Sequence, residues 1–379
     1  MYSLRDYGKM IRDEVRTRSY VEALRRTVRP DSVVVDIGTG PGILAMTACR
    51  FGARRVYAIE PDDVIELARE IAADNGFGER IEFIQAISTE VELPERADVV
   101  VAEIHGVLPL FGRSLATLID ARERFLAPSG AMVPFRETVH AAVIGNEALY
   151  ASVAGPWAQN THGLDLRRGR AHLTSDIYRV ELSPADLMSA PRRWTELDYL
   201  RITRVDVEDS LLFTAEKAGL AHGVGLWFES SLAGEVAMST QPGGTPLIFG
   251  NLLLPWPAAV ELETGDEIQV RIRAKLMEDR YIWQWETRVS SGGVERAHFA
   301  QSQFDMEIIV PEKLRRQGAH HVPGLNREGE MHRAALDGMA GGRSLGEIAA
   351  AMQREYPGRF ARWDDALKWV AGVSARCSD

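Results

Sequence analysis

A glycine-rich turn with an acidic residue downstream is the part of this sequence best suited to chemistry. Residues 33–42 read VVVDIGTGPG, so an apolar run leads directly into Gly38, Gly40 and Gly42. Glycines at this spacing let the backbone approach a ligand closely. A second apolar run, residues 56–59, ends at Glu60, whose carboxylate can accept both hydroxyls of a ribose. The pattern therefore predicts a site for a cofactor that contains a ribose.

Three details of this turn favour S-adenosylmethionine over a dinucleotide. The spacing is G-x-G-x-G rather than G-x-G-x-x-G, Asp36 ends the first strand, and a proline lies within the turn. The expected product is S-adenosylhomocysteine. Thr39 in the turn, Ile43 at the start of the next helix and Pro61 after Glu60 are candidate neighbours of the cofactor. A glycine turn alone would fit other α/β proteins, but here a strand, a helix at 43–51, a second strand and a helix at 63–75 follow one another as in a βαβ unit.

Composition excludes several classes of partner. The chain has 379 residues, 45% of them hydrophobic, which is enough for two or three domains. A net charge of −10 argues against a nucleic-acid or membrane-surface partner, since either requires a basic face. Two cysteines give neither a metal-binding spacing nor a disulfide framework, so we expect no metal site and a cytoplasmic location. The polar N-terminus predicts neither a signal peptide nor an anchor.

The order of apolar patterns predicts an α/β region followed by a β region. Residues 1–134 alternate strands, at 33–35, 56–59, 81–84 and 98–102, with helices, which is typical of a doubly wound parallel sheet. A helix at 6–26 precedes the first strand and is placed to close over the cofactor. Residues 135–315 contain short alternating segments, which indicate a β-barrel or sandwich. These segments lie at 200–207, 211–215, 223–228, 268–274 and 281–289.

Two further segments do not fit this β region. Residues 156–194 are predicted to be helical or irregular, and an arm of this length is suited to docking on a partner subunit. Residues 316–379 carry apolar residues at helical spacing in three stretches, 325–339, 344–356 and 364–375, with a capping box between Ser344 and Glu347. The C-terminal region is therefore predicted to be a small helical or winged-helix-like module.

Several separate motifs give the chain a family resemblance. They are MIRDEVRTRSY at 10–20, DIGTGPGILAM, GARRVYAIE, VELP at 91–94, AEIHG at 102–106, HGVGLWFES, MSTQPGG and ETGDEIQVRI. In content and order they resemble protein arginine methyltransferases over roughly residues 2–310. The resemblance implies a Rossmann-like methyltransferase domain, followed by a β-barrel whose inserted helical arm forms a head-to-tail homodimer.

The resemblance also assigns cofactor contacts. Arg16 occupies the position at which the family pairs a guanidinium with the carboxylate of the cofactor. Met10 would line the methylthio side. Tyr7 stands where the family usually has a histidine and is a candidate catalytic residue. In the stretch that contacts the adenine, this chain has Ile87 and Ser88 without the usual acid, so the resemblance implies a backbone or hydroxyl contact there.

On the acceptor side the sequence departs from the family pattern. Glu103 matches the first of two glutamates that bind the substrate guanidinium, but Gly112 stands at the second position. The Thr-His-Trp loop has no counterpart, because residues 245–251 contain no histidine. Asp13, the usual partner of that histidine, remains and is expected to serve only its helix.

These departures matter because a guanidinium has no free lone pair. Its pKa exceeds about 12, and two carboxylates can localise the charge so that one nitrogen becomes nucleophilic. With Glu103 alone the localisation is weaker. His105, two residues further along the loop, could instead remove a proton or orient a smaller nucleophile, or it could simply pack in the loop.

Three functional hypotheses follow. The first is an S-adenosylmethionine-dependent methyltransferase that acts on a nitrogen, of arginine or another nucleophile, in a peptide or a small molecule. The second is O-methylation in the same site, with His105 as base. The third is a scaffold that binds the cofactor without turnover. Residues 336–357, LDGMAGGRSLGEIAAAMQREYP, resemble winged-helix leader-peptide recognition domains, which would imply a peptide substrate; the alternative is a structural cap.

Overall fold

The computed structural model describes residues 2–158 and 163–378. The chain divides into two compact units, Met1–Ile308 and Ile309–Asp379. None of the helices within the described residues is both long and apolar enough to cross a lipid bilayer.

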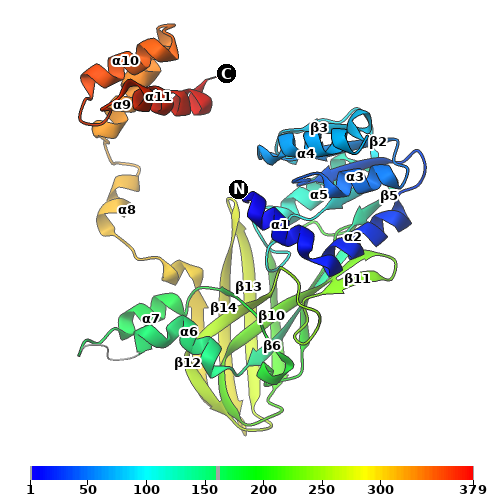
Figure 1. The fold of residues 1–379 in the computed structure, drawn as a ribbon. Helices are drawn as coiled ribbons and strands as arrows, with labels where there is room; N and C mark the ends of the chain where they lie inside the picture. The colour runs from blue at the N-terminus through cyan, green and yellow to red at the C-terminus, as the bar shows by residue number, and fades with distance from the viewer. Residues whose placement is uncertain (1, 159–162, 379) are drawn as a thin grey trace. The chain divides into compact units, whose positions relative to one another are not determined.

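A five-stranded parallel sheet forms the first part of the larger unit (Figure 1). Its strands are β1 (Val33–Ile37), β2 (Arg55–Ile59), β3 (Ile81–Ile84), β4 (Ala97–Ala102) and β5 (Leu126–Val133). Helices α3 (Ile43–Arg50), α4 (Val64–Asp74) and α5 (Ser114–Arg124) follow β1, β2 and β4. Every residue of β1 is buried, as expected for an apolar strand covered on both faces. Strands β1 to β4 lie where the sequence predicts them, whereas β5 was not predicted.

The strand order places the two chemically interesting loops side by side. The order is β3-β2-β1-β4-β5, so the chain leaves β1 toward one edge of the sheet and returns to β4 on the other side of β1. Ile37 pairs with Ala102 in the parallel register, and the glycine turn and Glu103 follow these two residues directly. In open parallel sheets, such a reversal point opens a crevice at the carboxyl ends of the strands.

The helix predicted at 6–26 is two helices, α1 (Leu4–Arg12) and α2 (Glu14–Thr27). The break is at Asp13, which has extended backbone angles and accepts a hydrogen bond from the backbone NH of Arg16 through its side chain. Aspartate is a strong helix N-cap residue, so it starts a second helix in the middle of an otherwise continuous helical pattern.

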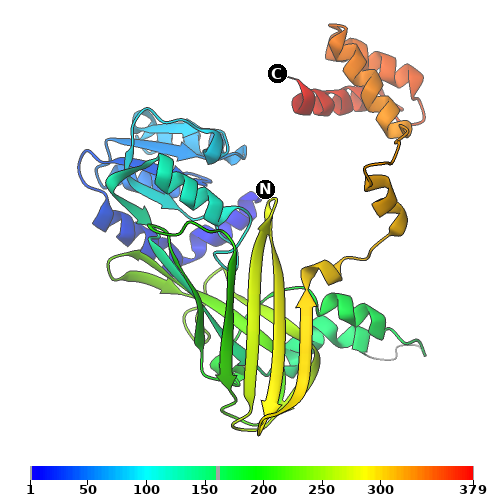
Figure 2. The same ribbon diagram turned by 180° about the vertical axis from the view of Figure 1, so that it is seen from behind.

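Two antiparallel sheets follow the parallel sheet in the chain. The first has the order β7-β12-β10-β6-β8 with β11 paired to β10, and the second has the order β15-β14-β13-β9; Figure 2 shows the second from its open face. Their strands are β6 (Arg136–Ile144), β7 (Tyr178–Val180), β8 (Arg192–Asp198), β9 (Val207–Thr214), β10 (Gly219–Ala233), β11 (Val236–Ser239), β12 (Asn251–Leu262), β13 (Glu267–Met277), β14 (Arg280–Ser291) and β15 (Val294–Ser302). The strand predicted at 200–207 is wrong, because residues 200–206 form the turn and loop between β8 and β9, which begins at Val207.

One apolar core joins the parallel and antiparallel sheets. Buried side chains run without interruption from Val34 in β1 through Trp194 in β8 to Trp285 in β14. The boundary expected at residue 134 is therefore a change of architecture within one packed body. Residues of the antiparallel sheets can form part of the same site as the glycine turn.

The helical insertion begins and ends earlier than the predicted range of 156–194. It consists of α6 (Glu147–Ala158) and α7 (Arg167–Leu173), whereas the later part of that range forms β7 and the start of β8. Arg170 of α7 donates a hydrogen bond of 2.7 Å to the hydroxyl of Tyr150 in α6. Residues 159–162 of the predicted arm lie outside the described residues.

The smaller unit is helical. Its helices are α8 (Pro311–Gln317), α9 (Arg327–Ala340), α10 (Leu345–Glu355) and α11 (Trp363–Cys377). Helices α9–α11 cover the three predicted stretches and share a small core that includes Ala335, Ile348 and Val370. The capping box of Ser344 and Glu347 is present. Within residues 309–378 the structure has no strand, so the β wing of a winged-helix module is not found there.

Candidate active site

A cavity of about 860 Å³ opens at the reversal point of the parallel sheet. The glycine turn, the loop after β4, helices α1 and α2 and parts of the antiparallel sheets form its walls. Lining residues include Tyr7, Met10, Arg16, Tyr20, Gly38, Thr39, Gly40, Ile43, Glu60, Pro61, Glu103, His105, Arg179, Phe249 and Trp283. The structure thus brings most of the predicted site residues together.

Four of the predicted cofactor residues do not line this cavity. Asp36 is buried beneath the turn, where it accepts a 2.6 Å hydrogen bond from the Thr39 hydroxyl, and burial raises the pKa of Asp36 to about 7. Gly42 faces helix α4, and a Cβ there would lie 3.2 Å from that of Ala68. Ile87 is exposed and Ser88 is buried away from the cavity. Asp36 and Gly42 therefore support the glycine turn on the side away from the cavity.

The glycine turn is fixed from both sides. Gly38 and Gly40 have positive φ angles of 72° and 51°, a conformation that side chains with a Cβ rarely adopt. A Cβ on Gly40 would lie 2.8 Å from the ring of Tyr7. The backbone NH of Gly40 donates a 3.0 Å hydrogen bond to Glu60, whose other oxygen accepts one from Asp62 at 3.1 Å. Burial raises the pKa of Glu60 despite these hydrogen bonds.

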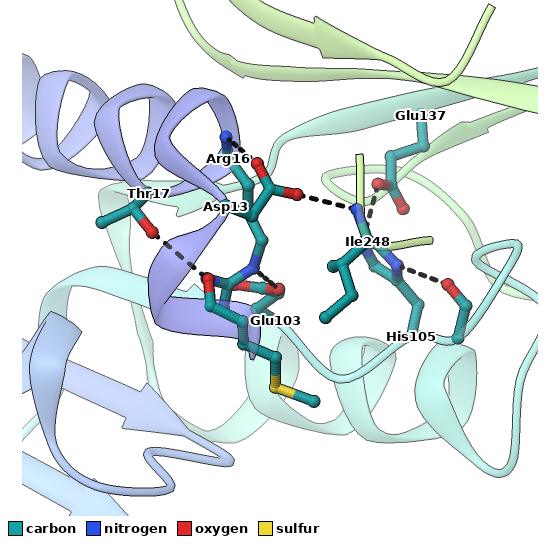
Figure 3. A network of polar contacts seen from close by, with 9 residues as sticks. Asp13, Arg16, Thr17, Glu103, His105, Glu137 and Ile248 are labelled. Atoms are coloured by element: carbon teal, nitrogen blue, oxygen red, sulfur yellow. Dashed lines mark hydrogen bonds and ion pairs between the residues drawn. The ribbon is translucent and has the colours of Figure 1, made fainter. Parts of the chain in front are cut away.

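Glu103 is the buried acid of the site, and it has one oxygen without a partner. Arg16 donates through Nε to Oε1 of Glu103 and through Nη1 to the carbonyl of Met10 at 3.0 Å (Figure 3). The side chain of Glu103 is 9% exposed, and its Oε2 has no hydrogen-bond partner among the described residues. Burial raises the pKa of Glu103, and the positive charge of Arg16 opposes this. An unsatisfied buried carboxylate oxygen is costly, so a donor from a ligand would stabilise it.

Asp13 links the helical side of the site to the antiparallel sheets. One of its oxygens accepts from the backbone NH of Arg16 at 3.0 Å, and the other accepts from the backbone NH of Ile248 at 2.8 Å (Figure 3). Ile248 belongs to the 245–251 segment, which has no histidine. The expectation that Asp13 serves only its helix is therefore wrong, because it holds the backbone of this segment directly.

The ring of His105 turns toward a buried acid rather than standing free. Its side chain is 4% exposed, and Nε2 lies 3.2 Å from Oε1 of Glu137, which is fully buried in β6. Tyr199 donates a hydrogen bond to the other oxygen of Glu137. Burial lowers the pKa of His105, but the Glu137 carboxylate outweighs this and the net pKa is raised. Burial raises the pKa of Glu137, yet the charge of the nearby His105 ring and the hydrogen bond from Tyr199 hold it below its ordinary value. Both shifts favour the form in which His105 is an imidazolium and Glu137 a carboxylate.

Sequence reasoning missed several of these residues. Glu137 could have been found, because it falls on the buried phase of β6 together with Val139 and Ala141, and a charge on that face calls for a buried partner. Tyr20 is the last residue of the MIRDEVRTRSY motif. It lines the cavity, and its buried hydroxyl has no hydrogen-bond partner among the described residues. No local pattern marks Arg179, which donates hydrogen bonds to the carbonyls of Ile248 and Phe249.

Within the described residues, no group of three or more histidine, cysteine, aspartate or glutamate side chains is arranged to hold a metal ion.

Comparison with known proteins places this site in context. The family model described as ribosomal protein L11 methyltransferase (PrmA) matches residues 15–142. A probable histone-arginine methyltransferase 1.4 of Arabidopsis thaliana is 32% identical over 281 residues, which are 69% of this chain and 53% of the relative. Protein arginine N-methyltransferase 6 of Xenopus laevis is 30% identical over 276 residues, which are 69% of this chain and 81% of the relative. The chain spans about half the length of the plant relatives it matches.

Solved structures share the fold of the larger part of the chain. The Trypanosoma brucei PRMT1 enzyme-prozyme heterotetrameric complex with AdoHcy has a TM-score of 0.72 at 24% identity, covering 78% of this chain and 96% of that chain. Protein arginine methyltransferase 10 of Arabidopsis thaliana has a TM-score of 0.70 at 21% identity, covering 79% of this chain and 97% of that chain. These likenesses agree with a methyltransferase-type parallel sheet joined to a β-rich region.

The double role of Asp13 can be tested by substitution. Asp13→Ala removes the cap of α2 and leaves the backbone NH of Ile248 without its acceptor. We expect the free energy of unfolding of the larger unit to fall by about 1 to 3 kcal/mol, measured by urea denaturation. Asp74→Ala, at the exposed end of α4, is the matched control, with an expected change within about 0.5 kcal/mol. Equal stability of the two variants would contradict the link.

Proposed function

This chain belongs to the protein arginine N-methyltransferase family, and on that premise we propose that it transfers a methyl group from S-adenosylmethionine to a nitrogen of an arginine side chain in a peptide or protein. The observation that supports this most directly is the unpaired, buried Oε2 of Glu103 at the wall of the cavity. A guanidinium carries five N–H donors and a positive charge, so it matches what this oxygen lacks.

The residues around the glycine turn fit the cofactor. Gly38 and Gly40 line the cavity, and a Cβ on either would collide with Ile104 or Tyr7. Glu60 lines the same cavity, with its carboxylate fixed by two backbone amides. Glu60 would bind the ribose hydroxyls, and Arg16 would bind the carboxylate, since its described hydrogen bonds use only Nε and Nη1. When bound, S-adenosylmethionine supplies an electrophilic methyl group on its sulfonium.

Glu103 would orient the acceptor. Its Oε2 would accept an N–H of the guanidinium, which draws positive charge toward that side and leaves another nitrogen more nucleophilic. Burial of Glu103 strengthens this interaction, because charges attract more strongly where water is excluded. Gly112 offers no second carboxylate, so Glu103 would carry this task without the second acid of the family pattern. Tyr20, with its unpaired buried hydroxyl, is a neutral acceptor in the same cavity.

Nothing in the site favours the two alternatives. O-methylation would need His105 as a base, but its ring is buried and already paired with Glu137. A scaffold without turnover would not need a buried acid with an unsatisfied oxygen, which Glu103 has.

For assembly we propose a homodimer in which the β-rich region closes as a barrel and the helices α6 and α7 form the arm. The support is exposed apolar surface on this insertion: Trp157 is 41% and Leu164 is 62% exposed, and aromatic residues are enriched at subunit interfaces.

The cofactor proposal is tested by filling the space at Gly40. Gly40→Val should abolish binding of S-adenosylhomocysteine in calorimetry, because the side chain would collide with Tyr7 and occupy the turn. Gly76→Val is the matched control: it has the same positive φ strain but nothing within 4 Å. If Gly40→Val retained its affinity for S-adenosylhomocysteine, the proposal that the glycine turn binds the cofactor would be refuted.

The role of Glu103 is tested by an isosteric change. Glu103→Gln keeps the shape but removes the charge, so we expect kcat for an arginine-containing peptide to fall about 100-fold or more, with little change in the Kd of S-adenosylhomocysteine. Transfer of a labelled methyl group is the measurement, and Glu70→Gln on the surface of α4 is the control. A fully active variant would remove Glu103 from the mechanism.

The arm is tested by placing a charge on it. Leu164→Asp should shift dimers toward monomers in light scattering, because a carboxylate buried in an apolar interface is costly. Leu200→Asp, at an exposed turn after β8, should leave the mass unchanged. Dimers that persist in Leu164→Asp at low concentration would contradict the proposed contact.

A further inference from the structure

We propose that His105 and Glu137 are positioning residues for Glu103: their buried ion pair fastens the loop after β4 to strand β6 and so fixes the carboxylate that binds the acceptor. This inference rests on the proposed function of Glu103. It assigns to His105 a role that requires its ring to face away from the acceptor.

Three consecutive side chains of this loop are held by three different elements. Glu103 is bound by Arg16 of α2. Ile104 packs against the glycine turn, where a Cβ on Gly38 would lie 2.6 Å from its Cγ2. His105 reaches Glu137 of β6 at 3.2 Å (Figure 3). The loop is thereby fixed from the helical side, from the cofactor side and from the antiparallel sheet.

The surroundings of the pair keep it in one arrangement. The His105 ring lies edge-on to Phe228 at 5.0 Å between centroids and also 5.0 Å from Phe249. Tyr199 donates to the carboxylate of Glu137 from the opposite side. The charged or titratable groups that act on His105 are Glu137 and Glu103. A ring enclosed in this way cannot rotate without exposing a buried charge.

The other end of the loop explains why such an anchor is needed. Gly106 is covered by the ring of Phe111, since a Cβ would lie 2.8 Å from it. Gly112 follows with a φ of 50° and has no side chain to reach the site. The loop has no acid at that end, so the position of Glu103 depends on contacts near residues 103–105. The positive charge on His105 also favours the ionised form of Glu103.

The test compares single variants on both sides of the pair. Glu137→Gln and His105→Gln keep volume and hydrogen-bonding atoms but remove one charge each. We expect kcat for an arginine-containing peptide to fall about tenfold to 100-fold, as for a displaced catalytic group, while the Kd of S-adenosylhomocysteine and the KM of the peptide change less than about threefold. Glu137→Asp, which keeps the charge, should recover part of kcat. His140→Gln, on the same strand β6 beside Trp227, is the matched control and should behave as wild type.

Two measurements that need no turnover separate this inference from the proposed function. In the wild type, nitrogen NMR of labelled histidine should show the His105 ring as an imidazolium at neutral pH. Hydrogen exchange of peptides covering 103–112 should become faster in Glu137→Gln. If the wild type methylates no arginine peptide but both results hold, the proposed function fails and the anchoring of the loop stands.

Three results would overturn the inference. One is a neutral His105 ring at pH 7 in the wild type. Another is unchanged exchange in the loop of folded Glu137→Gln. The third is wild-type kcat in either charge-removing variant. Should Glu137→Gln fail to fold, His105→Gln and the wild-type NMR spectrum still decide between these outcomes.

Discussion

The site depends on one buried carboxylate, Glu103, held at the carboxyl end of β4. A carboxylate that is 9% exposed is unfavourable unless charges and donors compensate for its lost water. Arg16 compensates one oxygen from helix α2. The other oxygen has no partner among the described residues, and the side chain to which it belongs lines the cavity. The fold thus brings a helix that precedes the sheet against a loop that follows its fourth strand, and it leaves part of the electrostatic requirement for a ligand to meet.

The parallel sheet forms only part of the walls of this site. Asp13 holds the backbone of Ile248, and His105 meets Glu137, so both polar links cross from the first 134 residues to the antiparallel sheets. Arg122 of α5 adds hydrogen bonds to two carbonyls of the loop after β8. The continuous apolar core holds the parallel and antiparallel sheets together. The polar links fix how the two regions are aligned at the site. This explains why a change of architecture at residue 134 does not separate two bodies.

The sequence predicted the site residues whose spacing lies within one motif. It did not predict the residues that reach the site through contacts distant in the sequence. The glycine turn, Glu60 and Arg16 are marked by spacing within one βαβ unit or one motif, and they converge on the cavity as expected. Asp13 shows the limit of periodicity, since one strong N-cap residue divides an amphipathic run into two helices. Glu137 contacts His105 of a different element, and Ile248 contacts Asp13 across 235 residues of sequence; no local spacing records such contacts. The residue type of His105 suggested a catalytic base. The direction in which its ring points, however, depends on Glu137, which the sequence did not reveal as its partner.

The balance of charge at the loop after β4 limits what this loop can bind. Arg16 pairs with Glu103, and His105 contacts Glu137, so each of these acids already has a basic group beside it. At this loop, attraction for a cationic acceptor must therefore come from Oε2 of Glu103, which is buried and has no hydrogen-bond partner among the described residues, and it acts at short range. Binding of that kind requires the acceptor to enter a dry pocket in a fixed orientation, because Coulomb attraction is strong only where water is excluded. The missing second acid thus makes the placement of Glu103 matter more than its charge alone.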